Sequence, residues 1–367
     1  MIHPEFDRRR LRVLPLSDRR NKLEIVRDHI SPTAEGGPLS SEAIAVVAES
    51  AERIRDAREN DRSVILTFGA HTIKNGLGPV LIHLMEAGWV THLATNGAGI
   101  IHDWEFAFQG QTSEDVAAGV EAGQFGIWEE TGRTINLALR VGAWERRGYG
   151  ESIGALIQND GLTIPSIEEL CNASAAVLDD PARAAAAADL LGAVRDFDLA
   201  PGRMAVPHPF KQYSPQAAAF QMGIPFTGHP MFGHDIIYNH PMNHGPAIGR
   251  TAERDYLRFA DSVTRIDGGV YLSVGSAVMS PMIFEKALSM AQNVERQSGG
   301  HIKNHFISVV DLAETTWDWE ADGEPPMDNA AYYLRYCKTF NRMGGTMRYA
   351  SADNRDFLLS LCRALEE

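Results

Sequence analysis

Short apolar runs that end in glycine-rich turns, each followed by a helical segment, constrain the fold of this chain most. SVILTFGA, residues 63–70, is apolar along most of its length, as expected for a strand buried on both faces of a sheet. The helical pattern GPVLIHLMEAG follows, with Pro79 in its first turn and Gly88 at its end. A second strand is predicted over 90–99, and the interval of about 30 residues is typical of one strand–helix–strand unit.

The same alternation returns in the C-terminal half of the chain. Strands are predicted over 268–278, 305–313 and 344–352, with helices after Pro281, over 328–342 and after the last strand. Four or five strands that alternate with helices predict an α/β fold, a Rossmann-like parallel sheet with helices on both faces. Residues 1–40 are expected to form an N-terminal arm, and residues 41–367 a single domain.

The remaining segments are expected to be helices and one loop. Residues 40–60 form a helical pattern that Ser40 or Ser41 can cap. Residues 112–146 are predicted to be helical from Thr112, where TSED has the pattern of a capping box, and residues 173–197 are predicted to be helical as well. Residues 222–241 are rich in proline and histidine and are interpreted as a loop.

Composition excludes several classes of function. With 34 basic and 48 acidic residues the net charge is −14, so nucleic acid is not an expected partner. No apolar stretch approaches the roughly 20 residues of a membrane helix, and the N-terminus lacks the apolar core of a signal peptide. Three widely spaced cysteines argue against disulfides and favour a reducing, cytoplasmic location. The basic cluster of the arm is interpreted as solvated, or as docking on an acidic neighbouring subunit; it comprises Arg8, Arg9, Arg10, Arg12, Arg19, Arg20 and Lys22.

Ligands of open parallel sheets bind beyond the carboxyl ends of the strands, where loop N–H groups face the crevice. Here these ends are rich in Gly, Ser, Thr and Asn, although no strict GxGxxG is present, and tight turns between packed elements would explain the glycines equally well. The predicted cofactor-binding residues are Gly69, His71, Asn75, Gly76, Thr95, Asn96, Gly97, Ser273, Gly275, Ser276 and Asp311.

Histidines close to carboxylates give the candidate catalytic residues. Imidazoles beside acids can act as general acids or bases, as metal ligands, or as structural groups bonded to the backbone. The spacing fits no standard zinc pattern and no cysteine accompanies it, so no metal ligand is assigned. The predicted catalytic residues are His102, Asp103, His234, Asp235 and His240.

The order of these segments resembles the deoxyhypusine synthase family over residues 60–362. The similar segments include FGAHTIKNGLGPVLIHLMEAGWVTHLATNGAGIIHD, IPFTGHPMFGHDIIYNH, VYLSVGSAV, FISVVDLAE and MRYASAD, and Asp235 and His240 keep that family's Asp–His spacing. The resemblance implies an NAD-dependent homotetramer with active sites at a dimer interface. It also implies transfer of the aminobutyl group of spermidine to a protein lysine.

The departures from that family change the expected reaction. Where its catalytic lysine should follow the glycine-rich strand end, this chain has no amine, and only an amine forms the Schiff base. Lys303 is the one stand-in considered. The positions concerned are Ala277–Ser280 for the lysine, Ile101 and His102 for an acidic pair, and Ser351 for a final-strand aspartate.

We therefore predict an enzyme that binds NAD or a related nucleotide and acts on a small polar substrate other than spermidine. Asp235 with His234 or His240 would be the acid–base pair. Two alternatives stay open at this point: a non-catalytic nucleotide-binding or structural homo-oligomer, and a metal-dependent hydrolase that uses the histidine-rich loop.

Overall fold

A six-stranded parallel sheet forms the centre of the molecule. The computed structural model describes residues 3–367, and the strands lie side by side in the order β10-β9-β8-β2-β3-β7. Numbered along the chain this is the order 3-2-1-4-5-6 of the Rossmann fold, so the predicted fold class is confirmed. The strands are β2 (Val64–Phe68), β3 (His92–Asn96), β7 (Phe226–His229), β8 (Val270–Val274), β9 (Phe306–Asp311) and β10 (Thr346–Ser351).

Five of these strands lie within the apolar runs that predicted them. The sixth, β7, lies inside the segment 222–241 that was expected to be a loop, so that prediction is wrong at Phe226–His229. β7 pairs with β3, and all four of its residues are buried. Its edge position and its short FTGH sequence explain why no apolar run marks it.

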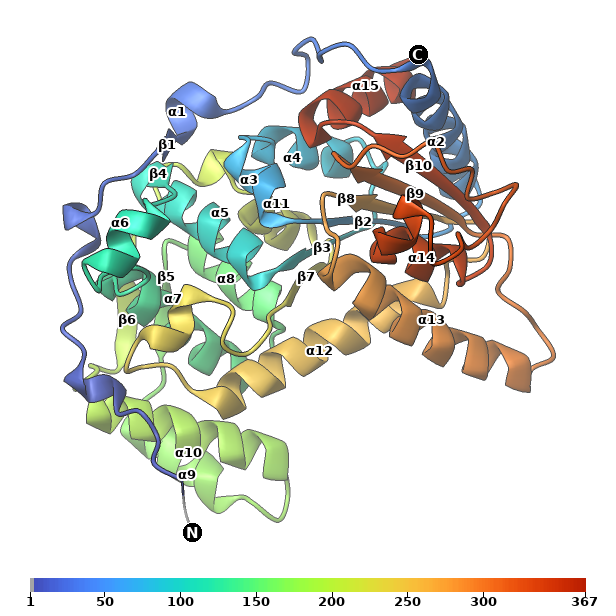
Figure 1. Cartoon of the computed structure of the whole chain (residues 1–367). Coiled ribbons are helices and arrows are strands. Elements are labelled where there is room, and N and C mark those ends of the chain that lie inside the picture. Colours follow the sequence, from blue (N-terminus) through green and yellow to red (C-terminus); the bar gives the residue numbers. More distant parts are fainter. Residues whose placement is uncertain (1–2) are drawn as a thin grey trace.

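Helices cover both faces of the sheet (Figure 1). Val64, Leu66 and Phe68 of β2 belong to one large apolar cluster, and Ile65 to a second cluster on the opposite face, as the two-residue period of a strand dictates. The first face packs against α2 (Ser41–Glu59), α4 (Gly78–Glu86) and α15 (Asn354–Glu366); the second packs against α12 (Gly245–Val263), α13 (Met279–Gln297) and α14 (Arg335–Asn341).

A long insertion separates β3 from β7. Thr112, predicted to begin a helix, instead lies in the short strand β4, and the following helix begins at Val116 with Asp115 as its cap. Ser40 caps α2 as predicted, accepting a hydrogen bond from the Ala43 amide at 3.1 Å. The insertion contains α5 (Gly97–Gln109), β4 (Gln111–Thr112), α6 (Val116–Glu121), α7 (Glu129–Trp144), α8 (Tyr149–Gln158), β5 (Gly161–Ile164), α9 (Ile167–Ala175), α10 (Pro181–Asp196), β6 (Gly202–Ala205), η3 (Lys211–Tyr213) and α11 (Pro215–Met222).

The N-terminal arm packs along the same chain rather than standing free (Figure 1). Leu16 and Ile25 are buried in the main core, and β1 (Leu23–Glu24) pairs antiparallel with β4. Arg19 is also buried, so the interpretation of the basic cluster as solvated is wrong for this residue. No helix within residues 3–367 combines the length and the apolar character that crossing a membrane requires.

Candidate functional site

A cavity of ≈ 200 Å³ opens where β2, β3 and β7 end. Three consecutive strands of the sheet contribute to it: Lys74 ends α3 (Ala70–Lys74), which follows β2; His102 and Glu105 lie on α5, which follows β3; and Asp235 follows β7. The arm adds Arg19 to its wall. The cavity is smaller than the roughly 300–1,000 Å³ clefts that bury drug-sized ligands, so it suits a small molecule.

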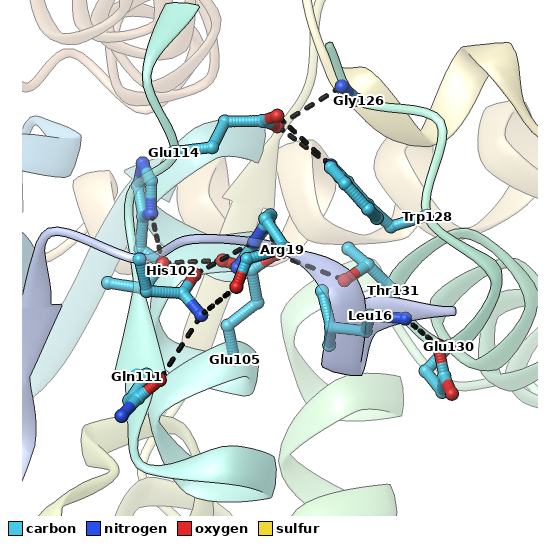
Figure 2. A network of polar contacts seen from close by, with 12 residues as sticks. Leu16, Arg19, His102, Glu105, Gln111, Glu114, Gly126, Trp128, Glu130 and Thr131 are labelled. Carbon is cyan, nitrogen blue, oxygen red and sulfur yellow. Dashed lines mark hydrogen bonds and ion pairs between the residues drawn. The ribbon is translucent and has the colours of Figure 1, made fainter. Parts of the chain in front are cut away.

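Arg19 and Glu105 form a buried ion pair in the wall of this cavity (Figure 2). Nη1 of Arg19 donates to Glu105 Oε1 at 2.7 Å, and Thr131 Oγ1 donates to the same oxygen at 3.0 Å. Burial alone would raise the pKa of Glu105, but the charge of Arg19 and the hydrogen bonds from Arg19 and Thr112 hold it below its usual value. Arg19 Nη2 has no hydrogen-bond partner among the residues described by the structure.

A hydroxyl group connects His102 to Glu105 (Figure 2). Thr112 Oγ1 donates to Glu105 Oε2 at 2.5 Å, so its lone pair is left to accept from His102 Nδ1 at 2.7 Å. This assigns the proton of the neutral imidazole to Nδ1 and leaves the lone pair of Nε2 free. Burial lowers the pKa of His102 to about 4, so the ring is neutral at pH 7 and accepts hydrogen bonds through Nε2.

Asp235 is the carboxyl group best suited to proton transfer. Its Oδ2 has no hydrogen-bond partner among residues 3–367, and burial raises the pKa of the group to about 7. The carboxyl group occupies the space beside the first residue of α5: a Cβ at Gly97 would lie 2.1 Å from Oδ2, so only glycine fits there. A general acid or base works best when its pKa is close to the working pH, and Asp235 meets this condition.

Two buried tyrosine hydroxyl groups lie near Asp235 and were not predicted from the sequence. Tyr149 on α8 is fully buried and Tyr238 in η4 (Ile236–Asn239) is nearly so, and neither hydroxyl has a hydrogen-bond partner within residues 3–367. Burial and then the charge of Asp235 raise the pKa of both phenols, so both are neutral. They are spaced too far apart in the sequence for a motif to reveal them.

The other predicted catalytic residues lie apart from the cavity or bind elsewhere. Asp103 points toward α11, where its Oδ2 accepts from Ser214 Oγ at 2.7 Å and from the Gln216 side chain at 2.8 Å. His240 Nε2 lies 3.1 Å from Glu129, and its Nδ1 accepts from the Met242 amide. Asp103 and His240 are not among the cavity-lining residues, so the predicted Asp235–His240 pair is not assembled here.

His234 and Lys74 both line the cavity. His234 is exposed, and with Asp235 it forms the part of the predicted acid–base pair that the structure brings to one place. Lys74 is partly buried and was not predicted. Its position directly after the first predicted strand could have identified it, because the loop after that strand was already expected to face the ligand. Ile101 and His102, where the resemblance expects an acidic pair, line the cavity as well.

The predicted cofactor-binding glycines lie where backbone and side chains of this chain approach closely. A Cβ at Gly69 would lie 2.1 Å from the carbonyl oxygen of Gly275, at the point where β2 and β8 end side by side. Gly275 has φ +60° and faces the Asn354 side chain, while Gly76 has φ +76° and faces the Asp28 carbonyl. Packing within the chain therefore accounts for these glycines, and their role in cofactor binding stays a prediction.

The remaining predicted cofactor-binding residues are spread along the same edge of the sheet. Asn96 caps α5 by accepting from the Gly99 amide, and Ser276 accepts from the Ser280 amide. His71 and Asn75 are exposed after β2. Three others bind or lie within the strands themselves: Thr95 donates to the Phe68 carbonyl, Asp311 accepts from the Ala313 amide, and Ser273 is buried in β8.

A larger, more open groove of ≈ 650 Å³ adjoins the cavity and shares Lys74 with it. Asn75 and Arg355 also line this groove, Arg355 in the first turn of α15. The acids beside them are engaged within the chain: Asp353 caps α15, Asp356 accepts from the Gly37 amide, and Asp28 binds Arg27. Lys74 and Arg355 form no ion pair within residues 3–367, and they line the groove together with these three carboxylates.

The histidine-rich loop does not form a metal site in the part of the chain that the structure describes. No group of three or more His, Cys, Asp or Glu side chains within residues 3–367 is arranged to hold a metal ion. The histidines of this region have separate surroundings: His229 bonds Thr227, His240 bonds Glu129, and His244 accepts from the Ala247 amide. The structure thus offers no support for the metal-dependent alternative.

Comparisons with known proteins find only distant structural similarity. No family model and no curated protein matches the chain. It is similar to apo ArgZ, an arginine dihydrolase of cyanobacteria (14% identity, TM-score 0.41, 88% of this chain and 32% of that one), and to AgrE in its ternary complex with ornithine and NAD⁺ (14%, 0.42, 90% and 34%). It is also similar to a putative deoxyhypusine synthase from Entamoeba histolytica (11%, 0.38, 88% and 85%).

The chain spans about a third of the length of ArgZ and AgrE. The presence of a deoxyhypusine synthase among the similar structures agrees with the distant resemblance predicted from the sequence. The activities named for these proteins belong to them, and the similarity to this chain concerns the arrangement of helices and strands.

Proposed function

We propose that this chain is an enzyme that binds NAD or a related nucleotide and catalyses proton transfer on a small polar substrate other than spermidine. One observation carries the proposal: the Asp235 carboxyl group, whose Oδ2 has no hydrogen-bond partner within residues 3–367, lines a small cavity with its pKa raised by burial to about 7. The cavity lies beyond the carboxyl ends of parallel strands, where sheets of this order bind their ligands.

The residues that line the cavity have different roles in the proposed reaction. Asp235 exchanges a proton with the substrate, because its protonated and ionised forms are both populated near pH 7. His102 accepts a hydrogen bond through Nε2, and the chain through Thr112 to Glu105 fixes its ring and tautomer. The apolar walls formed by Ala98 and Ile101 exclude water and strengthen these interactions.

The groove beside the cavity suits a nucleotide. Its volume of ≈ 650 Å³ lies within the range of small-molecule and cofactor clefts, and the free cations Lys74 and Arg355 can bind phosphate oxygens. Asn75, which was predicted to bind the cofactor, lines the same groove. NAD bound there would supply a hydride acceptor. Lys74, shared by both hollows, would lie between cofactor and substrate.

Binding of NAD is tested by calorimetric titration of the protein and of the variant Arg355→Met. Arg363→Met is the matched control, because Arg363 lies exposed at the far end of the same helix. The proposal expects binding by the native chain and the control and a loss of at least tenfold in affinity for Arg355→Met. Equal affinities for all three proteins would place the cofactor elsewhere, and absence of binding would refute the nucleotide part of the proposal.

Catalysis is tested by following reduced nicotinamide in the presence of panels of hydroxy acids, amino acids and polyols. Activity should disappear in Asp235→Asn and persist in Asp179→Asn, whose carboxyl group is exposed on the loop before α10. If NAD binds but is not reduced in the presence of any of these substrates, the result favours the non-catalytic nucleotide-binding alternative over the enzyme.

A further inference from the structure

Two cationic groups in the wall of the cavity lack the partners that such groups normally have. Lys74 forms neither an ion pair nor a hydrogen bond with any residue from 3 to 367, and its charge acts on the neighbouring His102, whose pKa it helps to lower. Arg19 uses Nη1 for Glu105 and Nε for Asn21, which leaves the donors of the buried Nη2 unused. Leaving such donors unsatisfied is unfavourable, but Nη2 is closed off from solvent, so Lys74 is the cation that a ligand in the cavity can contact.

Glu105 balances the charge of Arg19, but none of the acidic groups of the cavity forms an ion pair with Lys74 within residues 3–367. Glu105 is committed to Arg19 and to Thr112. Glu114 accepts from Trp128 Nε1 at 3.0 Å and from the Gly126 amide at 3.1 Å, and burial raises its pKa (Figure 2). Asp235 is surrounded by Gly97 and by buried phenols rather than by cations. A positive charge therefore remains at the Lys74 side of the cavity.

The opposite requirement holds at His102 and Asp235. His102 Nε2 presents a lone pair, and Asp235 Oδ2 has no donor, so these two groups accept hydrogen bonds. A ligand complementary to the lining carries an anionic acceptor for Lys74 and a hydroxyl or amino group for His102 and Asp235. The ≈ 200 Å³ of the cavity limits such a ligand to a small molecule.

We propose that the cavity binds a small organic acid whose carboxylate contacts Lys74 and whose hydroxyl or amino group faces His102 and Asp235. This names the substrate class of the proposed enzyme and rests on that proposal for its role in catalysis. It also separates this chain from an enzyme of polyamines, because a polyammonium ion would meet the unpaired Lys74 with like charge.

The test compares lactate with propionate and lactamide, which each differ from it in one group, and with the diamine putrescine. Binding to the protein without NAD is measured by ligand-observed NMR at constant ionic strength. Lactate, with carboxylate and hydroxyl, should bind most tightly, propionate several-fold more weakly, and lactamide and putrescine at least tenfold more weakly. Equal binding of lactate and lactamide, preferred binding of putrescine, or no binding of lactate would each overturn the inference.

Variants of Lys74 connect the binding to this cavity. Lys74→Gln should weaken lactate binding about tenfold or more, and Lys74→Arg should restore most of it. Lys303→Gln should leave it unchanged, since Lys303 is exposed before the N-terminal end of β9, whereas the cavity lies beyond the carboxyl ends of the strands. An unchanged affinity in Lys74→Gln would overturn the inference. If lactate binds as expected but no hydroxy acid or amino acid is oxidised with NAD, the carboxylate-binding site is supported and the proposed enzymatic function fails. If an uncharged substrate is oxidised with NAD while lactate does not bind, the enzymatic function is supported and the carboxylate-binding site fails.

Discussion

Replacing Asp235 by Asn is expected to abolish turnover and at the same time to stabilise the folded chain above neutral pH. Burial raises the pKa of Asp235 from 3.8 to about 7, so the folded state holds this proton more tightly than the unfolded chain does. Stability from this group is fully present below the unfolded pKa and is lost as pH rises toward 7. Asn has nearly the same shape and carries no charge, so it escapes this loss.

The size of the effect follows from the shift. Each pKa unit corresponds to about 1.4 kcal/mol, so a shift of roughly three units gives about 4 kcal/mol at pH 8. The N-terminus of α5 lies beside the carboxyl group at Gly97 and favours the ionised form by about 1 kcal/mol. We therefore expect Asp235→Asn to raise the free energy of unfolding by about 3 kcal/mol at pH 8 and to leave it nearly unchanged at pH 4.

Urea unfolding followed by circular dichroism at several pH values between 4 and 8 measures this difference. Because all other titrating groups are common to both proteins, subtraction isolates the contribution of Asp235. Asp179→Asn, an exposed aspartate, should show no difference at any pH. A difference for Asp235→Asn that does not grow with pH would mean that the carboxyl group is already ionised in acid, and the assignment of Asp235 as the acid–base group would fail with it.

Four further outcomes are expected. Arg19→Met should lower the free energy of unfolding by about 3–5 kcal/mol because it leaves the buried charge of Glu105 without a partner. Adding Glu105→Gln should recover part of this loss. Equal stability of the single and double variants in urea would contradict this expectation. Burial lowers the pKa values of His92 and His229 to about 3. The stability that these neutral rings contribute is therefore present above the unfolded pKa of 6.5 and declines as pH falls, by about 1.4 kcal/mol per pH unit for each ring. His92→Gln should reduce the dependence on pH of the free energy of unfolding, measured in urea between about pH 6 and 4. Light scattering should show a homo-oligomer, with a tetramer expected, and a particle of the 40.3 kDa monomer mass would refute this. Incubation with NAD, labelled spermidine and borohydride should label no lysine, and a label on Lys303, the stand-in considered from the sequence, would restore the aminobutyl chemistry through a displaced residue.

The sheet could be predicted from the sequence to the extent that its strands are apolar. Strands β2, β3, β8 and β9 are nearly continuous runs of buried side chains, whereas β10 at the edge is only partly buried. Residues such as Ile65 and Leu66 point to opposite faces that are both covered. β7 could not be predicted because FTGH has no such pattern; it is a strand because β3 offers it an edge and because Asp255 accepts hydrogen bonds from the Gly228 amide and the Gly150 amide at 2.7 Å.

The site could be predicted only in part. His102 was found because it follows the end of a predicted strand, and Asp235 because it lies among histidines and keeps the Asp–His spacing of the family that the sequence resembles. Arg19 was not, because its burial depends on Glu105, 86 positions away, and a basic arm without that contact would be solvated. Asp103 was predicted to be catalytic from its place beside His102, but adjacent residues of a helix face different directions, and Asp103 faces α11.

The order of the strands also determines how much of the chain must be synthesised before the central sheet can form. β2 lies at the centre of the sheet, and one of its neighbours is β8, whose Val270 pairs with Val64 about 200 residues earlier. Closing so long a loop is slow, because the chain loses conformational entropy before the contacts between β2 and β8 can offset that loss. A nascent chain that has not yet reached residue 270 carries an apolar strand with one open edge, the kind of surface on which chaperones act and from which aggregation starts. Fragments that end within the insertion should therefore be much less soluble than the whole chain.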